Sequence, residues 1–212
     1  MALCRAAGSR GVAAVVIGDR FAWGHLEKTG GDATLELFGE VPEVVRFADP
    51  LDSHDKHCPF RDRELAVRDK LLALNIRRLP AWILSKAQHT ARYGTYPDYE
   101  PWFMASPAEL AESREPDQRL AAFTDTGRFH VDRWLRTEFL DRDFLAFISE
   151  FVDIPESRRT AIVELAQVHG AATEAYDHQT DHWFSAGHVR RMYASNPAWA
   201  ALERRLYGDV PS

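Results

Sequence analysis

Cysteine is scarce in this sequence, since only Cys4 and Cys58 occur among its 212 residues. These two residues can form one bridge at most, which excludes a disulfide-rich secreted scaffold. Long apolar runs are also lacking, and none approaches the ~20 residues that a membrane-spanning helix needs. We therefore expect no membrane partner. Internal repeats and low-complexity linkers are missing too, which excludes repeat architectures.

Positive charge is in short supply as well, with 26 Lys and Arg residues against 32 Asp and Glu residues and a net charge of −6. This balance opposes the broad basic surface of a nucleic-acid-binding protein, although it is compatible with a local basic pocket for a small phosphate. The composition, 45% hydrophobic and 27% charged, is that of a globular chain long enough to bury its own core. We therefore expect no nucleic-acid partner.

The start of the chain differs from the rest. Arg5 and Arg10 precede a short apolar run that faintly resembles a signal peptide, but no clear small-residue cleavage site follows it. We predict an N-terminal extension over residues 1–18 and one domain over residues 19–212, in the cytoplasm.

Hydrophobic patterning predicts strands that alternate with helices along most of the chain. This order is typical of an α/β fold, and we expect a short parallel sheet flanked by helices, with a helical C-terminal part. On one predicted helix, Phe144, Phe147 and Ile148 share an apolar face that indicates core packing. The predicted strands are 20–26, 44–48, 71–76 and 129–135, and the predicted helices are 33–38, 62–70, 80–92, 141–152, 155–169 and two short ones around Pro197.

The sharpest motif is His-Leu-Glu-Lys-Thr-Gly-Gly-Asp-Ala-Thr at residues 25–34, between a predicted strand and a predicted helix. Gly30 and Gly31 allow a tight turn that approaches an anion, the helix N-terminus offers N–H groups, and Lys28 adds a full charge. Because the lysine precedes the glycine pair, the motif is not a Walker A loop. It predicts an anion site, with an ordinary turn as the alternative.

A second candidate lies after the predicted strand 71–76, where Ser85 follows Arg77 by eight residues. Ligands of open parallel sheets collect at the carboxyl ends of the strands. An arginine at such an end and a serine on the next helix can therefore meet one phosphate. The alternative is a surface cation and an incidental helix residue.

Together these two segments resemble the sulfotransferases that use 3′-phosphoadenosine 5′-phosphosulfate (PAPS). Residues 25–31 are similar to that family's 5′-phosphosulfate loop, often written His-x-x-Lys-Thr-Gly-Gly-Thr, and residues 77–85 are similar to its 3′-phosphate motif. More weakly, the Arg-Thr-Glu stretch at 136–138 resembles carbohydrate-type members. The match spans about residues 20–207.

The sequence departs from the family pattern at two positions. Asp32 stands where the family has Thr or Ser, and Pro80 lies three residues after Arg77 instead of two. The proline spacing leaves both Arg77 and Arg78 open as the 3′-phosphate ligand. Asp32 is also a good helix N-cap, and Thr34 is a candidate for the missing hydroxyl.

The resemblance implies a P-loop-like α/β fold and transfer of a sulfuryl group from PAPS to an acceptor hydroxyl of a carbohydrate or small molecule. Lys28 would be catalytic, and Arg77 and Ser85 would hold the 3′-phosphate. His57 is the candidate base, because the ordinary pKa of an imidazole, about 6.5, suits proton transfer; Glu27 or Glu36 could serve instead. The residues expected around the 5′-phosphosulfate are Lys28, Thr29, Gly30, Gly31, Asp32, Ala33 and Thr34.

Other functions compete with this one. Asp32 keeps open a non-catalytic nucleotide-binding protein on the same fold, whereas a P-loop kinase lacks its Walker A motif and a serine hydrolase its Gly-x-Ser-x-Gly. Histidines around residues 54–58 and 178–188 could supply zinc ligands, but no Cys-x-x-Cys accompanies them, so we expect no metal.

Overall fold

The computed structural model describes residues 16–48, 59–60, 64–93, 105–124, 130–170 and 178–210. The chain divides into two compact units. Unit 1 comprises Met1–Ile76 and Ala122–Ala172, and unit 2 comprises Arg77–Ala121 and Thr173–Ser212. His57 and both cysteines lie outside the described residues.

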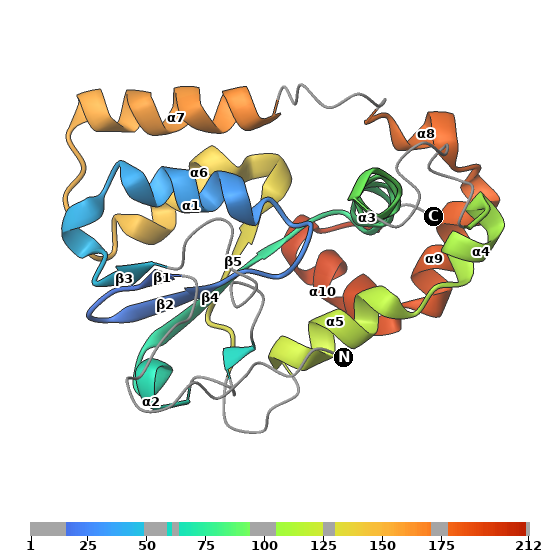
Figure 1. Cartoon of the computed structure of the whole chain (residues 1–212), viewed down its shortest axis with the longest axis horizontal. Coiled ribbons are helices and arrows are strands. Elements are labelled where there is room, and N and C mark those ends of the chain that lie inside the picture. The colour runs from blue at the N-terminus through green and yellow to red at the C-terminus, as the bar shows by residue number, and fades with distance from the viewer. Residues whose placement is uncertain are drawn as a thin grey trace. The chain divides into compact units, whose positions relative to one another are not determined.

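Unit 1 is built on a five-stranded sheet with the order β3-β1-β2-β4-β5 (Figure 1). As expected, its core is parallel, because β4 pairs in parallel with both β2 and β5. The sheet as a whole is mixed, however, since β1 runs antiparallel to β2 and β3. The strands are β1 (Val16–Ile17), β2 (Phe21–Gly24), β3 (Phe47–Ala48), β4 (Leu71–Ile76) and β5 (Arg133–Arg136).

The antiparallel edge has a simple physical origin. Residues 18–20 alone connect β1 to β2, and a parallel pair needs a crossover of a dozen or more residues, so this connection can only form a hairpin. Gly18 closes it by donating its N–H to the carbonyl of Phe21 at 3.0 Å. Through this hairpin, Val16–Ile17 becomes a strand of the sheet, although these residues lie within the stretch predicted as an extension.

Several predicted elements are shorter than expected, and the strands predicted over 20–26 and 129–135 are observed as the four-residue strands β2 and β5. Strand 44–48 is reduced to Phe47–Ala48, because a 3₁₀ turn, η1 (Pro42–Val44), begins at a proline and occupies the preceding residues. Of the helix expected over 62–70, the structure has α2 (Glu64–Val67), and residues 61–63 lie outside the described part. By contrast, β4 has the predicted bounds.

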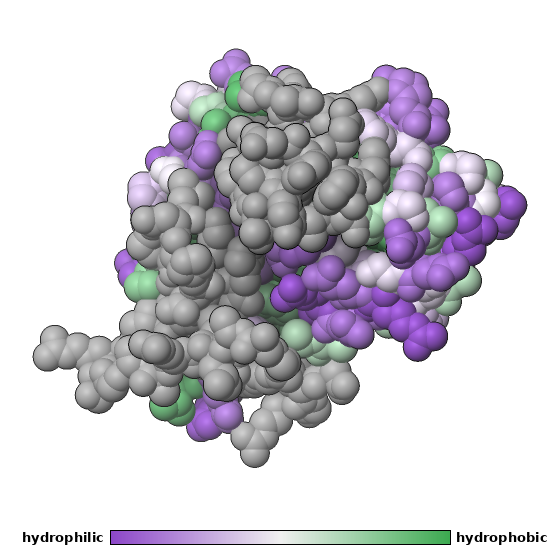
Figure 2. Space-filling model, turned by 45° about the vertical axis from the view of Figure 1, so that its right-hand side comes forward, coloured by the Kyte–Doolittle hydropathy of each residue, from purple (hydrophilic) through white to green (hydrophobic). Residues whose placement is uncertain are grey.

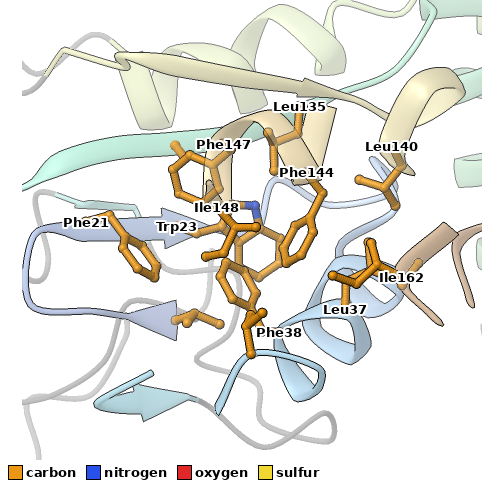
Figure 3. Close-up of a cluster of buried hydrophobic side chains, with 14 of the residues drawn as sticks. Phe21, Trp23, Leu37, Phe38, Leu135, Leu140, Phe144, Phe147, Ile148 and Ile162 are labelled. Atoms are coloured by element: carbon orange, nitrogen blue, oxygen red, sulfur yellow. The ribbon is translucent and has the colours of Figure 1, made fainter. Parts of the chain in front are cut away.

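Two helices of unit 1, α1 (Gly31–Gly39) and α6 (Leu140–Ile148), lie over one face of the sheet, and α7 (Glu156–Gly170) packs against both of them on the side away from the strands (Figure 1). The apolar face predicted for α6 is confirmed, since Phe144, Phe147 and Ile148 are buried. Figure 3 shows these side chains among those of β2 and α1. The ring centroids of Phe38 and Phe144 lie 5.1 Å apart in an edge-to-face arrangement, which aromatic pairs favour.

Unit 2 is helical, as predicted for the C-terminal part. The pair of helices expected around Pro197 is present, and the second begins at that proline, where a missing N–H costs least. Asp117 accepts the next two backbone N–H groups, from Ala198 and Trp199, at 3.0 and 2.8 Å. Its helices are α3 (Leu79–Tyr93), α4 (Pro107–Glu112), α5 (Glu115–Thr124, whose last residues belong to unit 1), α8 (Thr180–Trp183), α9 (Ala186–Ser195) and α10 (Pro197–Tyr207).

Among the described residues, no helix is both long and apolar enough to cross a membrane. Figure 2 shows mainly hydrophilic side chains on the coloured surface of one face, with hydrophobic side chains in small groups. Scattered exposed hydrophobic residues of this kind are normal for folded proteins and mark no particular site.

Candidate functional site

The candidate loop, residues 25–30, lies in unit 1 between the end of β2 and the start of α1. Strands β2, β4 and β5 are parallel, so their carboxyl ends meet at one edge of the sheet. Asn75, near the end of β4, and Thr137, directly after β5, therefore reach the loop. The site is assembled from three separate parts of the chain.

Glycine is needed at both positions of the pair, for a different structural reason at each. Gly30 has φ 79°, a left-handed conformation that glycine adopts without strain. A Cβ at Gly31 would lie 1.9 Å from the His25 ring, so only glycine fits there. His25 is itself buried and stacks on Trp23 with the ring centroids 5.9 Å apart. The spacing of His25 and Gly31 thus reflects direct packing.

Lys28 is the strained residue of the loop. Its φ of 63° is left-handed, which costs a non-glycine residue about 1 kcal/mol. Such conformations persist where the surroundings impose them, and they cluster at functional sites. The next residue is buried, and its Thr29 hydroxyl donates to the carbonyl of Leu26 at 2.6 Å. The loop is thereby held on the C-terminal side of Lys28.

Asn75 is fully buried and connects the loop to the sheet. Its side-chain amide donates to the Thr29 carbonyl at 3.0 Å and to the Thr34 hydroxyl at 2.6 Å. Its Oδ1 atom accepts from Trp23 Nε1 at 2.7 Å. One amide therefore fixes the loop, the first turns of α1 and the β2 side chain beneath them.

Thr137 supports the same point of the loop from the other side. Its hydroxyl lies 2.7 Å from the Thr29 carbonyl oxygen and 3.0 Å from that of Ile76. A Cβ at Gly30 would lie 3.0 Å from the Thr137 methyl group. Thr137 is the central residue of the Arg-Thr-Glu stretch, so this segment contacts the loop directly.

A half-buried ion pair anchors the segment that carries Thr137. Arg136 donates to both carboxylate oxygens of Asp143, with Nε–Oδ2 and Nη2–Oδ1 distances of 2.7 and 2.8 Å. Burial raises the pKa of the Asp143 carboxyl, but the hydrogen bonds from Arg136 outweigh burial and hold that pKa below its usual value. This bidentate pair fixes the start of η5 (Thr137–Phe139) against α6.

The first turn of α1 differs in detail from the expectation. The N-cap is Gly30, so Asp32 lies inside the first turn, exposed, instead of capping the helix. Thr34 is fully buried, and its hydroxyl donates to the Gly30 carbonyl at 3.0 Å while accepting from Asn75. The structure thus places this hydroxyl inside the protein. Ala33 is buried as well.

In unit 2, Arg77 is half-buried directly after β4, and Ser85 is buried on α3. Neither side chain forms a hydrogen bond or ion pair within the described part of the chain. Arg78 is engaged instead, because it donates to Asp209 at 2.8 Å and stacks on the Tyr207 ring at 4.1 Å. Among the described residues, the Arg78 side chain therefore has partners and the Arg77 side chain has none.

The three candidates for the base that would accept the acceptor's proton lie in different parts of the chain. His57 lies outside the described residues, whereas Glu27 is half-buried in the loop and Glu36 is exposed on α1. Across the described ranges, no three His, Cys, Asp or Glu side chains group as metal ligands would. His54 and Cys58, two candidate zinc ligands, also lie outside those ranges.

Sequence reasoning did not assign roles to Asn75 and Thr137. Asn75 carries a usable signal, because it is the one polar residue in the otherwise apolar strand Leu71–Ile76, and buried polar residues need partners.

No family model, curated protein or solved structure matches this chain. The geometry itself defines a preformed loop between a strand and a helix, with a lysine at its strained position.

Proposed function

We propose that this protein is a sulfotransferase that moves a sulfuryl group from PAPS to an acceptor hydroxyl. The observation that carries the proposal is the strained Lys28 in a loop whose Thr29 carbonyl, directly before the glycine pair, is held by both Asn75 and Thr137. A loop in this state presents its backbone and one lysine in a defined geometry, as binding of a phosphosulfate requires. The motif resemblance supports the same function.

The chemistry asks for positioning and charge stabilisation, with no covalent intermediate. The bond between sulfur and the donor's bridging phosphate oxygen breaks, and a bond between sulfur and the acceptor oxygen forms. Lys28 stabilises the negative charge that develops on the bridging oxygen as adenosine 3′,5′-bisphosphate leaves. The acceptor proton passes to a base, for which His57, Glu27 and Glu36 are the candidates.

The remaining donor and acceptor contacts follow from the resemblance. Arg77 and Ser85 bind the 3′-phosphate, and the absence of a partner for either side chain in the described chain supports this assignment. The residues around the 5′-phosphosulfate are those of the loop and the first turn of α1. The acceptor is a carbohydrate or small-molecule hydroxyl, which the Arg-Thr-Glu stretch beside the loop favours.

A specific observation favours a second candidate function, a non-catalytic nucleotide-binding protein on the same fold. Asp32 is an exposed carboxylate in the first turn of α1, where it interacts favourably with the helix dipole. At the same position it repels a bound phosphate, and the Thr34 hydroxyl faces into the protein. This arrangement weakens donor binding and is what a site without turnover would show.

Calorimetric titration with adenosine 3′,5′-bisphosphate tests the proposal. We expect binding in the micromolar range, with affinity reduced at least about tenfold in Lys28→Ala because a charge-assisted contact is lost. Arg68→Ala is the matched control, since it removes one positive charge of unit 1 at a surface ion pair with Glu64. Absence of binding to the folded wild-type protein would refute the proposal.

Turnover separates the two functions. Release of adenosine 3′,5′-bisphosphate from PAPS in the presence of acceptor hydroxyls indicates the transferase, whereas binding without release indicates the non-catalytic protein. Asp32→Thr restores the family's residue, and removing one negative charge near the phosphate is expected to tighten binding about fivefold. An unchanged affinity in Asp32→Thr would contradict the electrostatic role of Asp32.

A further inference from the structure

The connection between β4 and α3, which carries Arg77, is held from within unit 2 by α10. Trp199, in the first turn of α10, is fully buried, and its indole N–H donates to the Arg77 carbonyl at 3.1 Å. Its ring packs on that of Trp82 in α3, with the centroids 5.5 Å apart. The backbone of Arg77 is therefore bonded to a buried part of the unit.

A second residue of α10 occupies the N-terminus of α3. Glu203 is fully buried, and its Oε1 atom accepts the backbone N–H of Leu79, the first residue of α3, at 2.5 Å. A helix N-terminus is favourable for negative charge, and here the protein's own carboxylate fills that place. The first N–H group of α3 is therefore already bonded to a carboxylate of the protein itself.

Glu203 also forms an ion pair with Arg78. The Arg78 guanidinium lies 3.5 Å from the Glu203 carboxylate and 2.8 Å from that of Asp209. Tyr193 donates its hydroxyl to Glu203 at 3.0 Å, and burial together with the neighbouring carboxylate raises the pKa of that phenol, so it remains a donor. With two carboxylates beside it, Arg78 has its positive charge compensated.

We propose that α10 is the positioning element of the 3′-phosphate site: Trp199 fixes the backbone of Arg77, and Glu203 holds the neighbouring arginine away from the ligand. This inference rests on the proposed function and resolves the choice that the proline spacing left open. Arg77 is the phosphate ligand, and Arg78 is a structural residue of unit 2.

The test compares adenosine 3′,5′-bisphosphate with adenosine 5′-phosphate, which lacks the 3′-phosphate. Wild-type protein is expected to prefer the bisphosphate, and Arg77→Ala to lose this preference by about 30-fold, since hydrogen bonds to charged groups are strong. Arg78→Ala is expected to keep the preference. Trp199→Phe retains the aromatic packing but removes one hydrogen bond, and we expect it to reduce the preference about fivefold while leaving affinity for adenosine 5′-phosphate unchanged.

A matched control separates positioning from general loosening of α10. Asp117→Asn weakens the acceptor for the backbone N–H groups of Ala198 and Trp199 but leaves the indole N–H of Trp199 and the Arg77 carbonyl in place, and it is expected to lower thermal stability and keep the ligand preference. Loss of preference in Arg78→Ala, or full preference in Trp199→Phe, would overturn the inference while wild-type binding upheld the proposed function. Wild-type protein that binds neither ligand would overturn both.

Discussion

Replacing Asn75 by alanine removes the amide that ties the candidate loop to the sheet. The fully buried Asn75 side chain makes three hydrogen bonds, with Trp23, Thr29 and Thr34. The Thr29 carbonyl keeps its contact with Thr137, and the Thr34 hydroxyl keeps the Gly30 carbonyl. The indole N–H of Trp23 keeps no partner within the described chain.

The expected loss of stability follows from these contacts. A buried donor left without a partner costs about 1–3 kcal/mol, and each of the other two hydrogen bonds contributes about 1 kcal/mol. We therefore expect Asn75→Ala to lower the free energy of unfolding by about 3–5 kcal/mol. Because a domain is stabilised by only about 5–15 kcal/mol in total, this is a large fraction.

Urea denaturation followed by circular dichroism measures the effect. In a double-mutant cycle, Trp23→Phe removes the indole donor, and Asn75→Ala should then cost about 1–2 kcal/mol less than in the wild-type background. A loss below about 1 kcal/mol, or a coupling energy of zero, would refute the hydrogen-bonding role assigned to Asn75.

Asn196→Ala supplies a matched control in unit 2. Asn196 is also fully buried, donates to the Ser113 and Met192 carbonyls at 2.8 and 2.9 Å, and accepts from the Asp117 N–H at 3.2 Å. Both variants should lose similar stability, but Asn75→Ala alone disturbs the loop. Weaker binding of adenosine 5′-phosphate in Asn75→Ala, with binding kept in Asn196→Ala, is the expected outcome.

Three further changes probe the site. Gly31→Ala should destabilise the protein by about 3 kcal/mol, because its Cβ meets the His25 ring; calorimetry checks this, and His25→Ala in the same chain should restore part of the loss. Asp143→Asn should cost about 2 kcal/mol at pH 7. Since pairing with Arg136 lowers the Asp143 pKa, the wild-type advantage is present above about pH 4 and lost as pH falls below it; an advantage unchanged at pH 3 would contradict the pairing. Lys28→Gly relieves a left-handed lysine and should raise stability by about 1 kcal/mol while abolishing turnover; urea denaturation and donor turnover measure both effects.

Local patterns predicted the parts of the fold that depend on local sequence. The apolar run 71–76 is a strand with those bounds, and the spacing of Phe144, Phe147 and Ile148 identified the buried face of α6. The antiparallel edge was missed because Val16–Ile17 is too short to show alternation and depends on pairing with β2 for its structure.

The candidate loop was located from sequence because two adjacent glycines between an apolar strand and a helix indicate a tight turn at the helix N-terminus. What supports the loop could not be found in this way. Asn75 contacts Thr29 across 46 positions and Thr137 contacts it across 108, and no periodicity reports contacts between residues so far apart. The orientation of Thr34 was likewise decided by a distant amide and not by its neighbours in the chain.

The double support of the Thr29 carbonyl has a thermodynamic consequence for ligand binding. Ordering a flexible loop costs conformational entropy of about 1–2 kcal/mol for each backbone residue that is fixed. Here Asn75 and Thr137 fix the loop when the sheet forms, so this entropy is lost during folding. A ligand of this loop would therefore meet a surface whose shape is already set, and its association rate would be governed by diffusion and charge instead of by loop closure.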